Sequence, residues 1–198
     1  MKQHLKLRAL CEGAIFVAIS YVLSFLKVFQ MPQGGSVSLM ALPVLLYAVR
    51  WGLSSGLLAG CALGLLDCLV GGIFLVSWVS FLGDYIVAGA ALGLAGLFRR
   101  YSGGWGYFAG IAVGSLGRWA AWLVTGATLW KQYMPEGFTF LGISNNPWVY
   151  SFWYNSYAIV SGLLCLLVGG ILFSIPALRN YFTGSDLPRQ QNGQAQAF

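Results

Sequence analysis

Six apolar runs, separated by short polar or glycine-rich breaks, dominate this chain. A helix needs about 20 mostly apolar residues to cross a bilayer, so runs of this kind predict transmembrane helices. The pattern therefore predicts an all-α, polytopic membrane protein with six transmembrane helices. The expected spans are Leu10–Phe29, a shorter one at Val37–Val49, Leu53–Val70, a segment that begins with Ile73–Val79 and ends near Phe98, Trp105–Trp130, and Trp148–Ile175.

The breaks between the runs organise the chain into one membrane domain, residues 1–180, followed by a polar tail. The tail, residues 181–198, is rich in glutamine and is expected to be disordered. Helix breakers at Met31–Ser36 and at Gly71–Gly72 end the first and third spans. A longer loop, Lys131–Pro147, precedes the sixth span.

The composition of the chain narrows its class. Of its 198 residues, 58% are hydrophobic and only 8% are charged. A soluble domain carries about 25% charged residues, so this chain needs the lipid bilayer as its solvent. The net charge of +6 is attributed to membrane topology, and no nucleic acid partner is expected.

Basic residues near the span ends are distributed unequally between the two sides of the predicted bundle. With six spans, one side holds only Lys27 and Lys131. The other side holds both termini and the larger set, which is Lys2, Lys6, Arg8, Arg50, Arg99, Arg100, Arg179 and Arg189. Because cytoplasmic loops carry the excess of Lys and Arg, both termini are predicted to be cytoplasmic.

The residues needed for several kinds of chemistry are missing from the sequence. His4 is the one histidine, and the 4 cysteines form no CxxC pair, so neither a metal site nor a disulfide framework is expected. The sequence contains no GxxxxGK[ST] motif and no HExxH motif. We therefore expect a protein that is not an enzyme, requires no cofactor and does not itself hydrolyse ATP through a P-loop.

Three charged side chains, Asp67, Asp84 and Arg118, lie inside apolar runs. A charge near the bilayer centre costs at least about 2.5 kcal/mol, so each calls for an explanation. One explanation is structural, an ion pair of Arg118 with either aspartate. The other is functional: a carboxylate in the outer third of a span, followed directly by Tyr85, is suited to binding a polar or cationic ligand.

Aromatic residues gather around the outer loop, among them Trp122, Trp130 and Tyr150. They could form an interfacial belt, which needs no ligand. Their density also suits a pocket for a flat or cationic ligand, because Trp and Tyr rings attract cations. Asn155 adds an amide to this region, but on an ideal helix it points about 140° away from Tyr150. The two share a pocket only if the helix is distorted or the pocket wraps around it.

Ala14 and Ala18 lie four residues apart in the first span and present small side chains on one helix face. Such a face allows close helix packing in lipid. It could pack inside the bundle, or it could dock another membrane protein.

Several short stretches, in this order and spacing, resemble a known family over roughly residues 8 to 180. The chain is similar to the ThiT/YuaJ family, the thiamine-specific S-components of energy-coupling-factor (ECF) transporters. The matching stretches are Met31–Ser38, Arg50–Gly52, Asp84–Ala88, Ala91–Gly96, Tyr133–Gly137 and Asn146–Ser151 with Tyr154–Asn155.

The resemblance implies a six-helix subunit of the bacterial cell membrane that captures thiamine or a thiamine precursor near the outer face. It implies that Asp84 and Tyr85 bind the pyrimidine. Further ligand contacts are implied at Trp130, Tyr150 and Asn155, and docking of the transmembrane partner at Ala14 and Ala18. Where the family usually has a histidine, one turn after Arg118, this chain has Trp122, which offers a stacking ring and one donor.

The implied partners are an ECF transmembrane subunit and two ATPase subunits, which would supply the energy for uptake. The alternative interpretation is a stand-alone secondary transporter for thiamine or a related vitamin, coupled to protons through Asp67 or Asp84.

Overall fold

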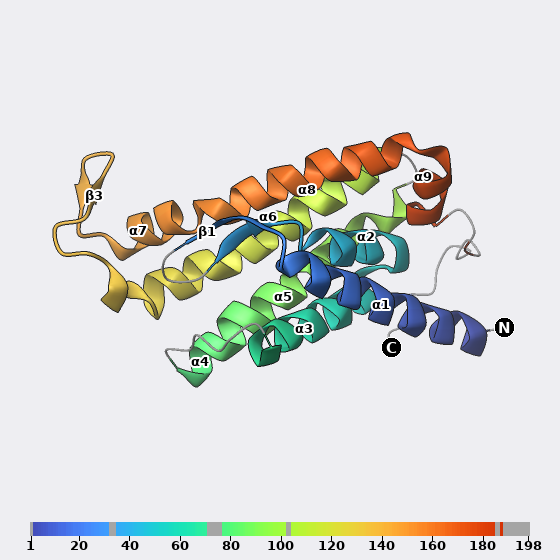
Figure 1. Ribbon diagram of the computed structural model, residues 1–198, viewed down its shortest axis with the longest axis horizontal. Helices are drawn as coiled ribbons and strands as arrows, with labels where there is room; N and C mark the ends of the chain where they lie inside the picture. The colour runs from blue at the N-terminus through green and yellow to red at the C-terminus, as the bar shows by residue number, and fades with distance from the viewer. Residues whose placement is uncertain (1, 32–34, 71–76, 102–103, 185–186, 188–198) are drawn as a thin grey trace.

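The computed structural model describes residues 2–31, 35–70, 77–101, 104–184 and 187. It is an elongated bundle of helices with two small hairpins (Figure 1). The helices are α1 (Lys2–Ser24), α2 (Leu42–Trp51), α3 (Leu53–Val70), α4 (Trp78–Ser80), η1 (Phe81–Val87), α5 (Ala88–Ala91), η2 (Leu92–Arg100), α6 (Gly104–Thr128), η3 (Lys131–Tyr133), α7 (Pro147–Tyr154), α8 (Ser156–Ser174) and α9 (Pro176–Phe182). The strands are β1 (Lys27–Gln30), β2 (Ser36–Ser38), β3 (Thr139–Phe140) and β4 (Ile143–Ser144).

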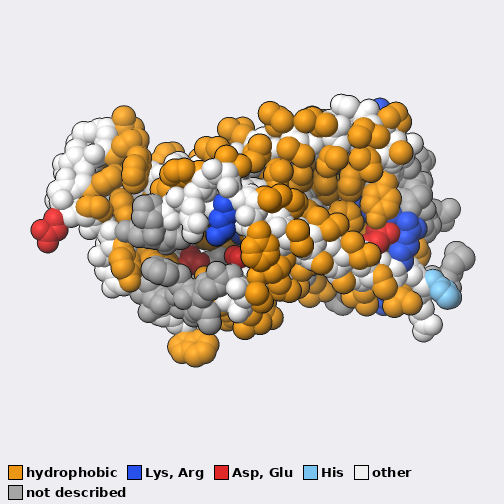
Figure 2. All heavy atoms as spheres, viewed as in Figure 1, with side chains coloured by type: hydrophobic (Ala, Val, Ile, Leu, Met, Phe, Trp, Pro, Cys, Tyr) orange, Lys and Arg blue, Asp and Glu red, His pale blue; other side chains and the backbone are white. Residues whose placement is uncertain are grey.

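Within the described part of the chain, four helical segments are both long and apolar enough to cross a membrane: Gln3–Ser24, Leu53–Val70, Trp78–Arg100 and Pro147–Ser174. Hydrophobic side chains cover much of the face shown in Figure 2, and many large ones are exposed along the helices. The predicted all-α membrane bundle is therefore confirmed. α6 has 25 residues, but α2 has 10 and spans only about 15 Å, half of a hydrocarbon core. The number of crossings stays a prediction.

Helix α2 is surrounded by protein. All nine residues from Leu42 to Arg50 are buried, and α2 lies among the longer helices (Figure 1). A short helix that does not face lipid has no need to match the bilayer thickness. This explains why the second apolar run is too short for a conventional span.

The small residues of α3 allow a close approach to the helical segment Trp78–Arg100, as the sequence predicted. A Cβ atom added to Gly60 would lie 2.1 Å from the carbonyl oxygen of Gly89, and one added to Gly64 would lie 2.0 Å from that of Tyr85. Only glycine fits at either position. This contact fixes the position of the Tyr85 backbone, and therefore of its neighbour Asp84, along the α3 helix.

The first predicted span differs from the structure. Helix α1 ends at Ser24, and Lys27–Gln30 forms β1, which pairs antiparallel with β2. The expected span at Val37–Val49 likewise begins as strand, with its helix starting at Leu42. The β1 segment contains Val28 and Phe29, whose side chains suit a strand as well as a lipid-facing helix. The remaining expected breaks lie largely outside the described residues, which omit 32–34 and 71–76.

The two termini of the helical bundle lie at the same end, where α1 begins and α9 packs (Figure 1). A buried ion pair joins them: Arg50 Nε donates to Glu12 Oε2 at 2.8 Å, and Arg50 Nη1 donates to the Tyr181 carbonyl oxygen. Arg99 Nη1 donates to the Trp51 carbonyl oxygen at 2.9 Å. Several basic residues assigned to one side of the membrane therefore do lie together at one end.

The predicted boundary between membrane domain and tail falls within a helix. α9 runs from Pro176 to Phe182, and Phe182 is buried against the core. Most of the expected disordered tail, residues 185–186 and 188–198, lies outside the described residues.

Candidate functional site

One cavity of about 360 Å³ opens in the half of the bundle that is remote from α9. Side chains from α1, both strands of the first hairpin, α3, η1, α6, α7 and α8 line it. A hollow containing acidic side chains beside a basic one is visible on the surface (Figure 2). All six candidate binding residues line this cavity: Asp84, Tyr85, Trp122, Trp130, Tyr150 and Asn155.

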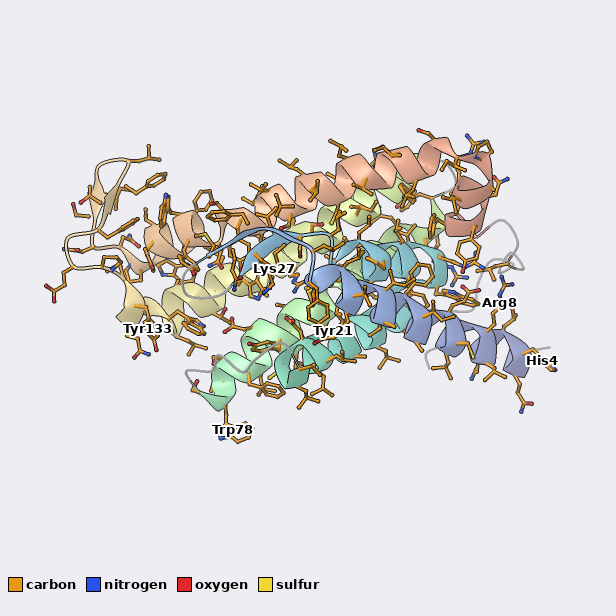
Figure 3. The ribbon with its side chains drawn as sticks, viewed as in Figure 1. His4, Arg8, Tyr21, Lys27, Trp78 and Tyr133 are labelled. Atoms are coloured by element: carbon orange, nitrogen blue, oxygen red, sulfur yellow. The ribbon has the colours of Figure 1, made fainter. Side chains whose placement is uncertain are left out.

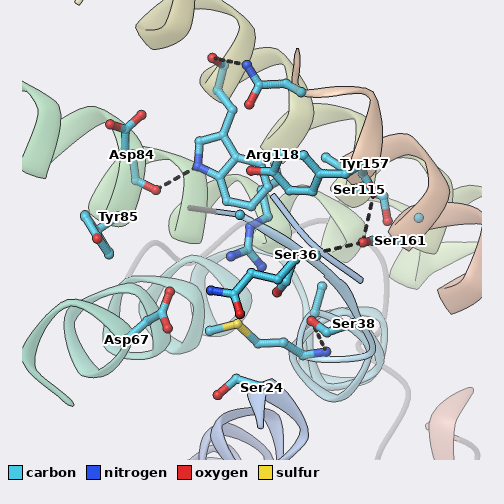
Figure 4. A pocket seen from close by; sticks show the side chains of 18 of the residues that line it. Ser24, Ser36, Ser38, Asp67, Asp84, Tyr85, Ser115, Arg118, Tyr157 and Ser161 are labelled. Atoms are coloured by element: carbon cyan, nitrogen blue, oxygen red, sulfur yellow. Dashed lines mark hydrogen bonds between the residues drawn. The ribbon is translucent and has the colours of Figure 1, made fainter. Parts of the chain in front are cut away.

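Asp84 and Tyr85 lie in η1, a seven-residue π-helix. π-helical turns are rare and often occur at functional sites, because the extra residue per turn redirects side chains. Gly64 of α3 packs against the backbone of this segment. The Asp84 carboxylate is thereby held at the cavity wall (Figure 4).

Three hydrogen bonds from α6 and the residues just after it converge on Asp84. Its Oδ2 accepts a hydrogen bond from Trp130 Nε1 at 2.7 Å, and its Oδ1 accepts one from the Thr125 hydroxyl. Its carbonyl oxygen accepts a hydrogen bond from Trp122 Nε1 at 2.9 Å. A carboxylate has about four lone-pair sites, so this one is oriented and still able to accept further hydrogen bonds.

The Trp122 ring contacts both a cation and a second aromatic ring. The Arg118 guanidinium carbon is 4.4 Å from the centre of the Trp122 ring, and the Tyr157 ring centre is 5.7 Å away. A cation–π contact thus holds the arginine side chain against the indole. The cavity is therefore walled by a fixed aromatic surface between Asp84 and Arg118.

A break in the last long helical segment brings Tyr150 and Asn155 to the same cavity. α7 ends at Tyr154, and Asn155 leaves the helical conformation before α8 begins at Ser156. The Asn155 Nδ2 group donates to the Trp122 carbonyl oxygen at 3.2 Å. The Tyr150 hydroxyl donates to the Tyr133 carbonyl oxygen at 3.4 Å, tying α7 to the outer loop. The helix is therefore distorted between Tyr150 and Asn155, which allows both side chains to reach the same cavity.

The proposed structural ion pair of Arg118 is not formed. Among the residues that the structure describes, Arg118 makes no ion pair with Asp67 or Asp84, although all three line the cavity. Its Nε atom is buried and has no hydrogen-bond partner there. The same described residues contain no group of three His, Cys, Asp or Glu side chains placed to hold a metal ion.

Sequence reasoning missed several polar residues that line the cavity. Thr125 was not singled out, although it lies one turn after Trp122 on α6. The first hairpin contributes Lys27, Gln30 and Ser36. Lys27 was expected in the first helix, and Ser36 in the turn that follows it, so neither was assigned to a binding site.

The two candidate docking residues, Ala14 and Ala18, are exposed on α1. Neither lines the cavity. Ile15 and Ile19, beside them on the same face, are also exposed. Helix α1 therefore presents a smooth apolar strip on the outside of the bundle.

Comparisons with known proteins agree over nearly the whole chain. The model of a family described as "Thiamine transporter protein (Thia_YuaJ)" matches residues 10–180. The thiamine transporter ThiT of Bacillus subtilis strain 168 is 34% identical over 187 residues, covering 87% of this chain and 94% of the relative. The protein of the same name from Lacticaseibacillus paracasei is 29% identical over 195 residues, covering 88% and 91%. A solved structure of ThiT from Listeria monocytogenes shares the fold, with a TM-score of 0.69 at 23% identity, covering 87% of this chain and 97% of that one.

Proposed function

This chain belongs to the family of thiamine transporter proteins (Thia_YuaJ), and we propose that it binds thiamine or a thiamine precursor as the capture subunit of a bacterial uptake system. It is a multi-pass membrane protein and not an enzyme. One observation carries the proposal: Asp84 and five other polar and aromatic residues, chosen from the sequence, all line one cavity of about 360 Å³. Ligand sites commonly have volumes of about 300 to 1,000 Å³.

The binding mode follows from the hydrogen bonds already in place. Thr125 and Trp130 fix both oxygens of the Asp84 carboxylate, which keeps lone pairs available toward the cavity. The exocyclic amine of an aminopyrimidine can donate to this carboxylate. The Tyr85 and Trp122 rings provide surfaces for the flat and cationic parts of thiamine.

Tyr150 and Asn155 complete the outer wall of the proposed site. Asn155 is anchored by its bonds to Trp122 and Ser151, so its amide oxygen is positioned to accept from a polar edge of the ligand. Tyr150 connects the site to η3 through Tyr133. We infer that the outer loop acts as the cover of the site because α7 and η3 meet at this bond.

For transport, we propose that the chain works with an ECF transmembrane subunit and two ATPase subunits. The exposed Ala14–Ala18 strip of α1 would dock the transmembrane partner, because small residues let helices approach closely in lipid. The eight basic residues near the helix ends support an orientation with both termini in the cytoplasm of the bacterial cell. The cavity then opens toward the outside.

Thiamine binding to the purified protein, followed by quenching of tryptophan fluorescence, tests the proposal. We expect the parent to bind thiamine and the Asp84→Asn variant to bind it about 10- to 100-fold more weakly, the range for a hydrogen bond to a charged group. The matched control is Glu136→Gln, because Glu136 is exposed on the outer loop and does not line the cavity. Equal affinity of Asp84→Asn and the parent would contradict the assigned role.

Uptake by vesicles distinguishes the transport mechanisms. We expect sustained thiamine uptake only when the ATPase complex is present. Uptake by this chain alone that collapses with the proton gradient would instead establish a proton-coupled transporter.

A further inference from the structure

The cavity has a second polar region that the binding of a pyrimidine at Asp84 does not use. Asp67 of α3 and Arg118 of α6 face the same space as Asp84 from different helices (Figure 4). Lys27 at the start of β1 (Figure 3) also lines the cavity. Trp122 separates the two regions, since its Nε1 binds the Asp84 carbonyl oxygen and its ring lies under the Arg118 guanidinium.

Several polar atoms in this second region have no partner among the residues that the structure describes. The Nε atom of Arg118 and the hydroxyl of Ser115 are buried without a hydrogen bond, and both residues line the cavity. The Tyr21 hydroxyl is also buried without a hydrogen bond, and Tyr21 also lines the cavity. Buried polar atoms are nearly always hydrogen-bonded in proteins, because leaving one unsatisfied costs about 1 to 3 kcal/mol. Because no described residue pairs with the Arg118 guanidinium, and Arg118 lines the cavity, its hydrogen-bonding capacity is available to a ligand there.

Asp67 gives this region an acceptor as well as donors. Within the described part of the chain, its carboxylate accepts no hydrogen bond and forms no ion pair. A carboxylate inside an apolar span costs free energy, and such residues are usually paired or have a function. The region therefore offers a carboxylate that accepts hydrogen bonds and a guanidinium that donates them. A hydroxyl group can bind to both, because it donates one hydrogen bond and accepts others.

We propose that Asp67 and Arg118 form a second subsite that binds the terminal hydroxyl of the ligand, with Asp67 accepting the hydroxyl proton and Arg118 donating to the hydroxyl oxygen. This inference rests on the proposed function, because thiamine carries a primary alcohol on the ring remote from its aminopyrimidine. The subsite also sets selectivity. Arg118 and Lys27 attract an anionic group at that position, and the Asp67 carboxylate opposes this attraction, so Asp67 lowers the affinity for a phosphate ester relative to the free alcohol.

The test measures three affinities for each variant by tryptophan quenching. The ligands are thiamine, an analogue in which the hydroxyl is replaced by hydrogen, and thiamine monophosphate. We expect the parent to bind thiamine about 10- to 100-fold more tightly than the deoxy analogue, the range for a hydrogen bond to a charged group. Asp67→Asn is expected to reduce this ratio severalfold and to raise the affinity for thiamine monophosphate relative to that for thiamine, because it removes the negative charge that opposes the phosphate.

Asp84→Asn serves as the matched control, because it should weaken thiamine and the deoxy analogue by the same factor. If Asp67→Asn also weakens both ligands equally, or leaves both ratios unchanged, Asp67 does not contact the hydroxyl and the inference is wrong. Arg118→Lys keeps a charged donor, and should retain more of the hydroxyl preference than Arg118→Met; equal ratios for these two variants would remove Arg118 from the subsite. A parent that binds none of the three ligands would instead refute the proposed function itself.

Discussion

Replacing Glu12 with glutamine is expected to destabilise the protein by about 3 kcal/mol while leaving ligand binding intact. Glu12 lies at the end of the bundle remote from the cavity, and its carboxylate compensates the charge of Arg50, whose side chain is 0% exposed. Removing one partner of a buried ion pair typically costs about 3 to 5 kcal/mol, because the other charge remains buried.

The contacts of the carboxylate set the size of this effect. Arg50 Nε and Trp51 Nε1 donate to Oε2 at 2.8 Å and 2.7 Å, and Arg8 Nε donates to Oε1 at 2.8 Å. Glutamine keeps one acceptor oxygen, so it can preserve one set of these bonds and loses the negative charge. Since hydrogen bonds to charged groups contribute about 1.5 to 3 kcal/mol each, the expected loss lies at the low end of the range for a broken buried pair.

Denaturant titration of the detergent-solubilised protein, followed by circular dichroism, measures the free energy of unfolding. The control is Arg8→Gln, which removes the outer partner of the same carboxylate. The Arg8 side chain is 42% exposed, so its removal should cost at most about 1 kcal/mol. If Glu12→Gln cost no more than Arg8→Gln, the buried pair would not be a major source of stability. A loss of thiamine binding in a folded Glu12→Gln protein would also contradict the separation of the two ends.

Two further substitutions test the wall around Asp84. Gly64→Ala should abolish tight thiamine binding, because its Cβ would lie 2.0 Å from the Tyr85 carbonyl oxygen and would displace η1; fluorescence titration measures the affinity. Trp130→Phe keeps a ring but removes the 2.7 Å bond to Asp84, and should weaken binding about 5- to 30-fold in the same assay.

Each of these substitutions has a matched control. Gly170→Ala adds a methyl group that meets Phe108 at 3.6 Å, an ordinary contact, and should leave binding unchanged. Trp148→Phe alters an exposed tryptophan that does not line the cavity and should also be neutral. If Gly170→Ala weakened thiamine binding as much as Gly64→Ala, or Trp148→Phe as much as Trp130→Phe, the loss of affinity would not arise from a change at Asp84.

The helical bundle could be predicted from the sequence because lipid imposes a strong constraint on length and polarity. Apolar runs marked the helices well, and the small residues of α3 correctly indicated close packing. The hairpin of β1 and β2 was missed because Val28 and Phe29 are as apolar as a span. The π-helix around Asp84 was missed for a different reason. π-helical turns are rare, and a local hydrophobic period does not distinguish them from α-helical turns.

The candidate site was predictable where a residue is unusual for its surroundings. Asp84 stands out as a charge in an apolar run, and Trp122 and Trp130 stand out by size. Thr125 does not, since a threonine in a transmembrane helix commonly bonds to its own backbone. Asp67 and Arg118 were recognised as unusual, but their relation to each other depends on how α3 and α6 pack. Only the fold shows that they share the cavity without forming an ion pair.

A crystal structure of the protein grown with thiamine shows whether the Asp84 carboxylate binds the aminopyrimidine. We expect ligand density inside the cavity, with the aminopyrimidine amine within hydrogen-bond distance of the Asp84 carboxylate. Density at another place, or a ligand in the cavity that does not contact Asp84, would contradict it.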